Sequence, residues 1–246
     1  MTGLAENLER VEEEIAQVCR RAGRSRSDVE LMAVTKTCPA AVIAKAAALG
    51  LTLIGENRVQ EFAGKASELE PLRSRDTKPI RVHLIGHLQS NKAQRAVELF
   101  DAIDSLDSPR LAERINDAAG KLGKRLPVLI EVKLSPEETK AGVDPESAEA
   151  AALLERLQDF VNLEARGLMT IAPWGAPEST TRECFRALRT LRDGWARTHS
   201  RLALDVLSMG MSGDFALAIE EGATRIRIGT ALFGKRAPQP PDPEQP

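Results

Sequence analysis

Leu31-Met32-Ala33-Val34-Thr35-Lys36 is the stretch of sequence around which the rest of the chain is organised. A short apolar run rich in β-forming residues predicts a buried strand, and Thr37-Cys38-Pro39 closes it with a turn before a helix. In a barrel of parallel strands, side chains at the carboxyl ends of the strands point into the functional site. A lysine there, between apolar walls, would lose part of its hydration, which favours a nucleophilic amine suited to forming a Schiff base. The competing interpretation is a solvated lysine at a strand exit.

Composition limits the classes of protein to which the chain can belong. Its 246 residues are 42% hydrophobic and 28% charged, with a net charge of −2, as in an ordinary globular protein with a sizeable core. The basic residues form no long runs, so we expect neither a nucleic-acid nor a membrane partner. No apolar stretch approaches the ~20 residues of a membrane span, and the N-terminal segment lacks the apolar core of a signal peptide. Three cysteines without CxxC spacing indicate reduced thiols in the cytoplasm. Separately, we expect the protein to be a monomer.

The chain alternates between strand-like and helix-like segments. An amphipathic helix with apolar residues from Leu4 to Val18 comes first, and each predicted strand is then followed by a predicted helix. Eight such units in one chain without a linker predict a single-domain (β/α)8 TIM barrel over residues 1–236, with an extra N-terminal helix. A doubly wound sheet is the alternative, although it would need only five or six strands. The proline-rich tail, 237–246, is expected to be disordered. The predicted strands are 31–36, 51–55, 80–86, 101–106, 127–132, 165–171, 202–207 and 223–228.

Two successive glycine-containing segments near the C-terminus indicate a phosphate site. Gly229 and Thr230 stand where the eighth strand turns into a short helix, and the preceding loop is Ser208-Met209-Gly210-Met211-Ser212. Barrels often bind phosphate at the loops after strands 7 and 8. Each segment alone could be an ordinary glycine turn, but together they favour a phosphate cradle.

Arg227 alternates with two isoleucines, so it is predicted to share a strand face with Arg225 and Gly229, opposite Ile226 and Ile228. It could simply be a buried arginine with a carboxylate partner. A guanidinium only donates hydrogen bonds, and aimed at a pyridine nitrogen it would keep that nitrogen unprotonated.

Two further polar clusters follow strands. Asn57 in Gly55-Glu56-Asn57-Arg58 is either a helix cap or a site residue. His83 and His87 have the spacing of metal ligands on a helix, but they straddle the end of a strand and no acidic residue completes a set. We therefore expect no metal site.

These segments resemble the pyridoxal phosphate homeostasis protein family, whose members bind pyridoxal 5′-phosphate (PLP) on the alanine racemase N-terminal barrel fold. The resemblance covers the chain to about Arg236. The segments that carry it are Ala33-Val34-Thr35-Lys36, Gly55-Glu56-Asn57, residues 83–92, Gly167-Leu168-Met169, residues 207–212 and Arg227-Ile228-Gly229-Thr230.

The resemblance implies a site for PLP. It implies a Schiff base from Lys36, and Arg227 near the pyridine nitrogen. The residues that it implies beside the phosphate or the ring are Ser208, Gly229, Thr230, Asn57 and Met211. Two positions depart from the family pattern: Arg58 stands where tyrosine is common, and Lys133 where asparagine is common. These departures concern the rim of the site and any transfer of PLP to a second lysine.

Two functions compete. The first is a non-catalytic carrier that takes part in intracellular PLP homeostasis by holding the cofactor and passing it to apo-enzymes. The second is an amino-acid racemase or a related PLP enzyme, with weak activity. A two-base racemase needs a second proton carrier, which in alanine racemases is a tyrosine beside an additional β domain; this chain contains no tyrosine and ends with the barrel. A third interpretation, a class I aldolase, would need acid–base carboxylates that the sequence does not place beside Lys36. We therefore expect a carrier rather than an enzyme.

Overall fold

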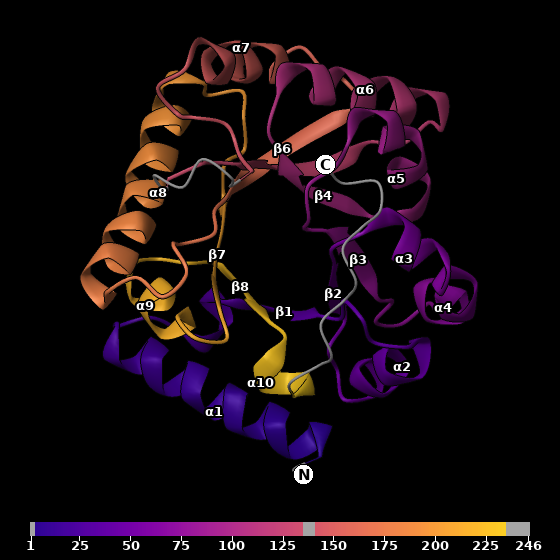
Figure 1. The fold of residues 1–246 in the computed structure, drawn as a ribbon, viewed down its shortest axis with the longest axis vertical. Helices are drawn as coiled ribbons and strands as arrows, with labels where there is room; N and C mark the ends of the chain where they lie inside the picture. Colours follow the sequence, from indigo (N-terminus) through magenta and orange to yellow (C-terminus); the bar gives the residue numbers. More distant parts are fainter. Residues whose placement is uncertain (1–2, 135–140, 235–246) are drawn as a thin grey trace.

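The structure, a computed structural model, describes residues 3–134 and 141–234. Eight parallel strands form a closed barrel in chain order, because β1 pairs with both β2 and β8. Figure 1 shows the ring of strands enclosed by the helices. The predicted (β/α)8 barrel with an additional N-terminal helix is therefore confirmed. The strands are β1 (Glu30–Val34), β2 (Leu53–Glu56), β3 (Arg81–Leu84), β4 (Ala102–Leu106), β5 (Leu126–Glu131), β6 (Leu163–Met169), β7 (Val206–Met211) and β8 (Arg225–Ile228).

Helices follow the strands and cover the outside of the barrel. Local signals start several of them: Ser108 caps α6 by accepting a hydrogen bond from the Leu111 amide, and Ser147 caps α7. The described helices are α1 (Leu4–Arg21), α2 (Ala40–Ala48), α3 (Val59–Ala63), α4 (Ala66–Arg73), α5 (Ala93–Leu99), α6 (Pro109–Lys121), α7 (Ala148–Leu157), α8 (Glu178–Thr198), α9 (Phe215–Glu220) and α10 (Thr230–Phe233), with short 3₁₀ turns η1 (Arg26–Asp28) and η2 (Ser90–Lys92). None of the helices within the described ranges has both the length and the apolar character that crossing a membrane demands.

The main hydrophobic core lies between the strands and the helices. The outward-facing residues of β1, Leu31 and Ala33, belong to it, together with Ile226 and Ile228 of β8. A separate small cluster fills part of the barrel interior and consists of Met32, Val34, Leu53 and Ile85. This division follows the two-residue period of a strand, which turns alternate side chains to opposite faces.

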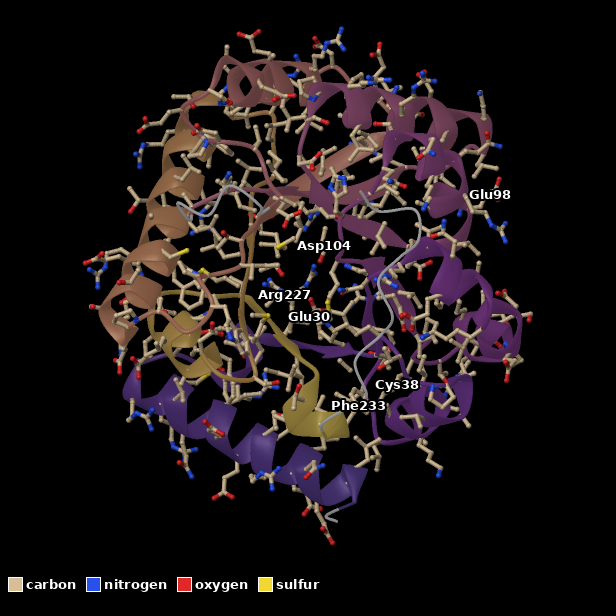
Figure 2. The ribbon with its side chains drawn as sticks, viewed as in Figure 1. Glu30, Cys38, Glu98, Asp104, Arg227 and Phe233 are labelled. Atoms are coloured by element: carbon tan, nitrogen blue, oxygen red, sulfur yellow. The ribbon has the colours of Figure 1, made fainter. Side chains whose placement is uncertain are left out.

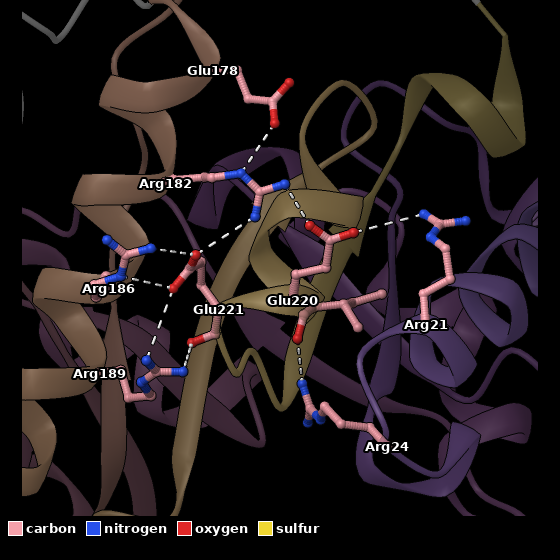
Figure 3. A network of polar contacts seen from close by, with 9 residues as sticks. Arg21, Arg24, Glu178, Arg182, Arg186, Arg189, Glu220 and Glu221 are labelled. Atoms are coloured by element: carbon pink, nitrogen blue, oxygen red, sulfur yellow. Dashed lines mark hydrogen bonds and ion pairs between the residues drawn. The ribbon is translucent and has the colours of Figure 1, made fainter.

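The N-terminal helix joins the first and last parts of the fold. The Asn7 side-chain amide donates to the Leu232 carbonyl at 2.9 Å, and Arg24 donates to the Ile219 carbonyl at 2.8 Å. Figure 3 shows the adjoining ionic network, in which three arginines of α8 surround a buried carboxylate just after α9. The residues of this network are Arg21, Arg182, Arg186, Arg189, Glu178, Glu220 and Glu221. These ion pairs hold α1, α8 and α9 against one another on the outside of the barrel.

Two strand predictions were wrong in their position. The sixth strand was predicted at 165–171, but β6 is Leu163–Met169. The seventh strand was predicted at 202–207, but β7 is Val206–Met211. Leu202 and Leu204 are buried in the main core without forming a strand, because turn hydrogen bonds hold this segment. Most of the loop predicted from Ser208 to Ser212 is instead part of β7, which is buried from Leu207 to Gly210.

Two regions depart from a simple alternation of one strand with one helix. Two helices, α3 and α4, follow β2, and α4 continues past Pro71 to Arg73. The helix that follows β5 begins only at Ala148, after its cap Ser147. The predicted tail, 237–246, lies outside the described residues.

We predict that Gly167 is required for the pairing of β6 with β7. A Cβ atom at this position would lie 1.9 Å from the Val206 carbonyl oxygen. Gly167→Ala should therefore lower the free energy of unfolding by about 3 kcal/mol, measured by urea denaturation. Gly194→Ala is the matched control, because it lies in α8 with no atom within 4 Å of its added Cβ. It should leave stability unchanged or raise it by up to about 1 kcal/mol. Equal effects of the two substitutions would contradict the prediction.

Candidate functional site

A cavity of about 740 Å³ opens at the carboxyl ends of the strands. Residues from β1, β5, β7 and β8 and from the loops that follow the strands line it, so it lies where barrel enzymes and binding proteins place their sites. The structure brings together in this cavity six of the seven residues predicted to bind a cofactor: Lys36, Asn57, Met211, Arg227, Gly229 and Thr230.

Lys36 reaches the cavity because of strand alternation. Met32 and Val34 point into the barrel, while Leu31 and Ala33 pack against the helices, so Lys36 continues the inner row two residues beyond the end of β1. Val34 and Ile85 form an apolar wall of the cavity that Lys36 also lines. The Lys36 residue is nevertheless exposed at the mouth, so the partly dry amine expected from the sequence has an apolar wall but is still open to solvent.

Arg227 is held rigidly on the cavity wall. Only 4% of it is exposed, and its guanidinium donates to the Ser208 hydroxyl and to the Thr170 carbonyl, each at 2.9 Å. Burial lowers the pKa of Arg227, and the nearby carboxylates of Asp104 and Glu131 act in the opposite direction. Figure 2 shows Arg227 directed toward the middle of the strand ring. The predicted strand face of this arginine is confirmed, because Ile226 and Ile228 lie in the outer core.

Ser208 is the one predicted residue that does not line the cavity. It lies inside β7, is fully buried, and its hydroxyl accepts the hydrogen bond from Arg227. Ser212, four residues further along, lines the cavity together with Gly213. Its hydroxyl accepts from the Ala231 amide at 3.3 Å, which ties the loop after β7 to the start of α10. Ser208 is buried rather than at the cavity because β7 extends to Met211, four residues beyond the predicted end of the seventh strand.

A charged layer fills the barrel below the cavity. Asp104 contacts His83 at 3.0 Å and Arg225 at 3.1 Å, and Arg225 also pairs with Glu30. Figure 2 shows Asp104 and Glu30 inside the ring of strands. Burial alone would raise the pKa of Asp104, but His83 and Arg225 outweigh burial and hold that pKa below its ordinary value. His83 therefore has a carboxylate partner in the interior and is not paired with His87.

Glu131 is a cavity residue that the sequence reasoning missed. It is 5% exposed, and its Oε2 atom is buried without a hydrogen-bond partner. Burial, reinforced by Asp107, raises the pKa of Glu131 to about 7. Asp107 also contacts His87, another residue that lines the cavity: the His87 Nδ1 atom lies 3.2 Å from Asp107 Oδ2. This hydrogen bond raises the pKa of His87. The sequence signal was a carboxylate within an otherwise apolar strand, Val128-Leu129-Ile130-Glu131-Val132.

The rim of the cavity is partly apolar. Trp174 is 88% exposed and Ile171 is 38% exposed, and both line the opening with Leu134 and Lys133. Asp214 also lines the cavity and accepts a hydrogen bond from the Met211 amide.

Within residues 3–134 and 141–234, no cluster of three or more His, Cys, Asp or Glu side chains could hold a metal ion.

Comparison with known proteins agrees with the barrel fold. The sequence matches the family described as alanine racemase, N-terminal domain, over residues 7–237. A pyridoxal phosphate homeostasis protein of Aquifex aeolicus is 44% identical over 231 residues, covering 94% of this chain and 97% of the relative. One of Pseudomonas aeruginosa is 40% identical, covering 96% and 97%.

A solved structure resembles the chain closely. PipY of Synechococcus elongatus PCC7942, determined with PLP bound, is 44% identical and has a TM-score of 0.78, covering 89% of this chain and 100% of that one. The match therefore extends over almost the whole length of both proteins. With this barrel and these relatives, the chain belongs to the pyridoxal phosphate homeostasis protein family, within the alanine racemase N-terminal domain family.

Proposed function

We propose that this protein binds PLP in the cavity at the mouth of the barrel, as a Schiff base with Lys36, and takes part in PLP homeostasis by delivering it to apo-enzymes. Residues 1–236 would act as one binding domain. The observation that carries the proposal is that a lysine, a buried arginine and two hydroxyl-bearing loops line one cavity. The PLP bound to PipY supports it, since that protein is 44% identical.

The polar groups in the cavity fit the three functional parts of PLP. Ser212, Gly229 and Thr230 lie together on the β7–β8 side and suit a phosphate group, which in such barrels is bound by the loops after strands 7 and 8. The Ser212 hydroxyl replaces that of Ser208 in this proposal. Arg227 can donate a hydrogen bond to a pyridine nitrogen, and Lys36 supplies the amine.

Each residue has a distinct task in this proposal. PLP supplies an aldehyde that an amine can capture with loss of water, and Lys36 provides that amine. The Thr170 and Ser208 contacts fix the Arg227 guanidinium, so it cannot swing away from the ring position. A guanidinium that stays protonated gives the ring nitrogen no proton, which weakens the cofactor as an electron sink. This arrangement favours holding PLP over carbanion chemistry.

The carrier role is supported by what the relatives are called and by the groups at the site. The relatives of Aquifex aeolicus and Pseudomonas aeruginosa described above are named pyridoxal phosphate homeostasis proteins. The chain has no tyrosine to serve as the second base of a racemase. The acceptors would be PLP-dependent apo-enzymes, with no nucleic acid or membrane involved. Cys19, Cys38 and Cys184 are buried and are not joined in disulfides, which suits a cytoplasmic protein.

Replacing Lys36 tests the anchor. Lys36→Ala should remove the visible absorbance of the Schiff base and leave no cofactor fixed by borohydride, with stability nearly unchanged because the side chain is exposed. Lys124→Ala is the control, since Lys124 donates to the Val97 carbonyl, away from the cavity. Peptide mass spectrometry after reduction identifies the modified lysine. A Schiff base that persists in Lys36→Ala would show another anchor, with Lys133 the first to examine.

Glu131 should make the stability of the cofactor-free protein depend on pH. Its pKa is about 7 in the folded protein and ordinarily 4.5, so the folded state holds the extra proton between these values and loses stability as the pH rises through them. Glu131→Gln should thus be more stable than the wild type by about 3 kcal/mol at pH 8 and nearly equal at pH 4. Urea unfolding at both pH values measures the difference, and a pH-independent difference would refute the assignment.

Transfer and racemisation assays separate the carrier from the enzyme. Holo-protein mixed with a PLP-dependent apo-enzyme should restore the activity of that enzyme. The same holo-protein incubated with single amino-acid enantiomers should leave their configuration almost unchanged on the time scale of transfer. Rapid racemisation without transfer would reverse the assignment.

A further inference from the structure

A buried ionic cluster lies behind the turn that carries Lys36. Lys65, which follows α3, is 7% exposed and does not line the cavity. Its ammonium nitrogen lies 2.9 Å from Glu56 Oε1 at the end of β2 and 3.0 Å from Glu61 Oε1 in α3. Glu56 is fully buried and also accepts a hydrogen bond from the Thr35 hydroxyl. Buried charges of this kind are costly unless paired, so the cluster calls for an explanation.

The same ammonium group contacts the backbone on both sides of Lys36. It donates to the Cys38 carbonyl at 3.0 Å and approaches the Thr35 carbonyl at 3.4 Å. These two carbonyls belong to a tight turn, because the Cys38 amide donates to the Thr35 carbonyl at 2.9 Å. The lysine thus holds the two ends of the turn against β2 and α3.

The turn needs such an anchor because its backbone is strained. Thr37 has a φ of 64°, in the left-handed region, which a β-branched residue rarely adopts. Its amide donates to Glu61 Oε1 at 2.7 Å, the oxygen that also contacts Lys65. Strained residues persist only where surrounding contacts hold them, and they concentrate at functional sites.

We propose that Lys65 is a positioning residue, which fixes the strained turn around Lys36 and so aims its amine at the aldehyde carbon of the cofactor. The inference rests on the proposed function. In the step concerned, the Lys36 nitrogen forms a double bond to the aldehyde carbon, and the aldehyde oxygen leaves as water with both protons of the neutral amine. Lys65 takes no part in that exchange, since its contacts lie on the outer side of the turn.

The test compares Lys65→Met with Lys124→Met. Lys124 is a matched control, because its ammonium also donates to backbone carbonyls, those of Val97 and Glu98, far from the cavity. Lys65→Met should slow formation of the Schiff base with added PLP by about tenfold to a hundredfold, followed by absorbance and borohydride trapping. Lys124→Met should react at the wild-type rate, even if its thermal stability falls.

A second variant separates positioning from stability. Lys65→Met leaves Glu56 buried without its cation, so Lys65→Met/Glu56→Gln removes both charges and protects the fold. This double variant should unfold cooperatively and still react slowly. A folded double variant that reacts at the wild-type rate would overturn the proposal.

Hydrogen exchange in the cofactor-free protein gives a readout that does not need PLP. The Cys38 amide should exchange faster in Lys65→Met than in the wild type, with no such change in Lys124→Met. Unchanged exchange at this amide would likewise overturn the proposal. If the wild type itself forms no Schiff base at Lys36, the proposed function fails, and the exchange experiment still decides whether Lys65 anchors the turn.

Discussion

Parallel pairing of β1 with β8 is the constraint on which the site depends. Glu30 pairs with Arg225 and Ala33 with Ile228, which joins parts of the chain 195 positions apart. Because the two strands run in the same direction, Lys36 after β1 and Gly229 after β8 reach the same mouth. An amine from the beginning of the chain and a loop from its end thereby face one cavity. An open sheet would leave these groups at opposite edges.

Charge inside the barrel is arranged in levels. In the lower level Asp104 contacts His83 and Arg225, and Arg225 pairs with Glu30, which satisfies groups that burial would otherwise penalise. Arg227 lies nearer the cavity and donates hydrogen bonds to two neutral groups, the Ser208 hydroxyl and the Thr170 carbonyl. Its positive charge can therefore act on a group in the cavity. Glu131 is the exception, because one of its oxygens has no partner. The upper level is thus less completely paired than the lower one, as expected of a surface that receives a ligand.

The barrel and six residues that line the cavity could be predicted from the sequence, largely because strands follow a two-residue period. The alternation of arginine with isoleucine in β8 gave the correct face for Arg227, and the apolar run before Lys36 placed it at a strand end. The shift of β7 could not be read in this way. Leu202 and Leu204 are as apolar as strand residues, and glycine in Ser208-Met209-Gly210-Met211 suggests a turn, whereas Gly210 allows β7 to pass close to α9 with a φ of 92°. The contacts of Lys65 were also invisible, since they depend on how α3 packs behind β1.

The closure of the barrel has a consequence for how the chain is made. One neighbour of β1 in the barrel is β8, and α1 packs on α9 and α10, so β1 and α1 are synthesised well before the elements that they pack against. Until those elements are synthesised, Leu31, Ala33 and the apolar face of α1 have no complete surface to cover them. Contacts between such distant segments form slowly, because a long loop must close first. Apolar surface of α1 and β1 therefore stays exposed until β8, α9 and α10 are in place, and exposed apolar surface of this kind favours aggregation.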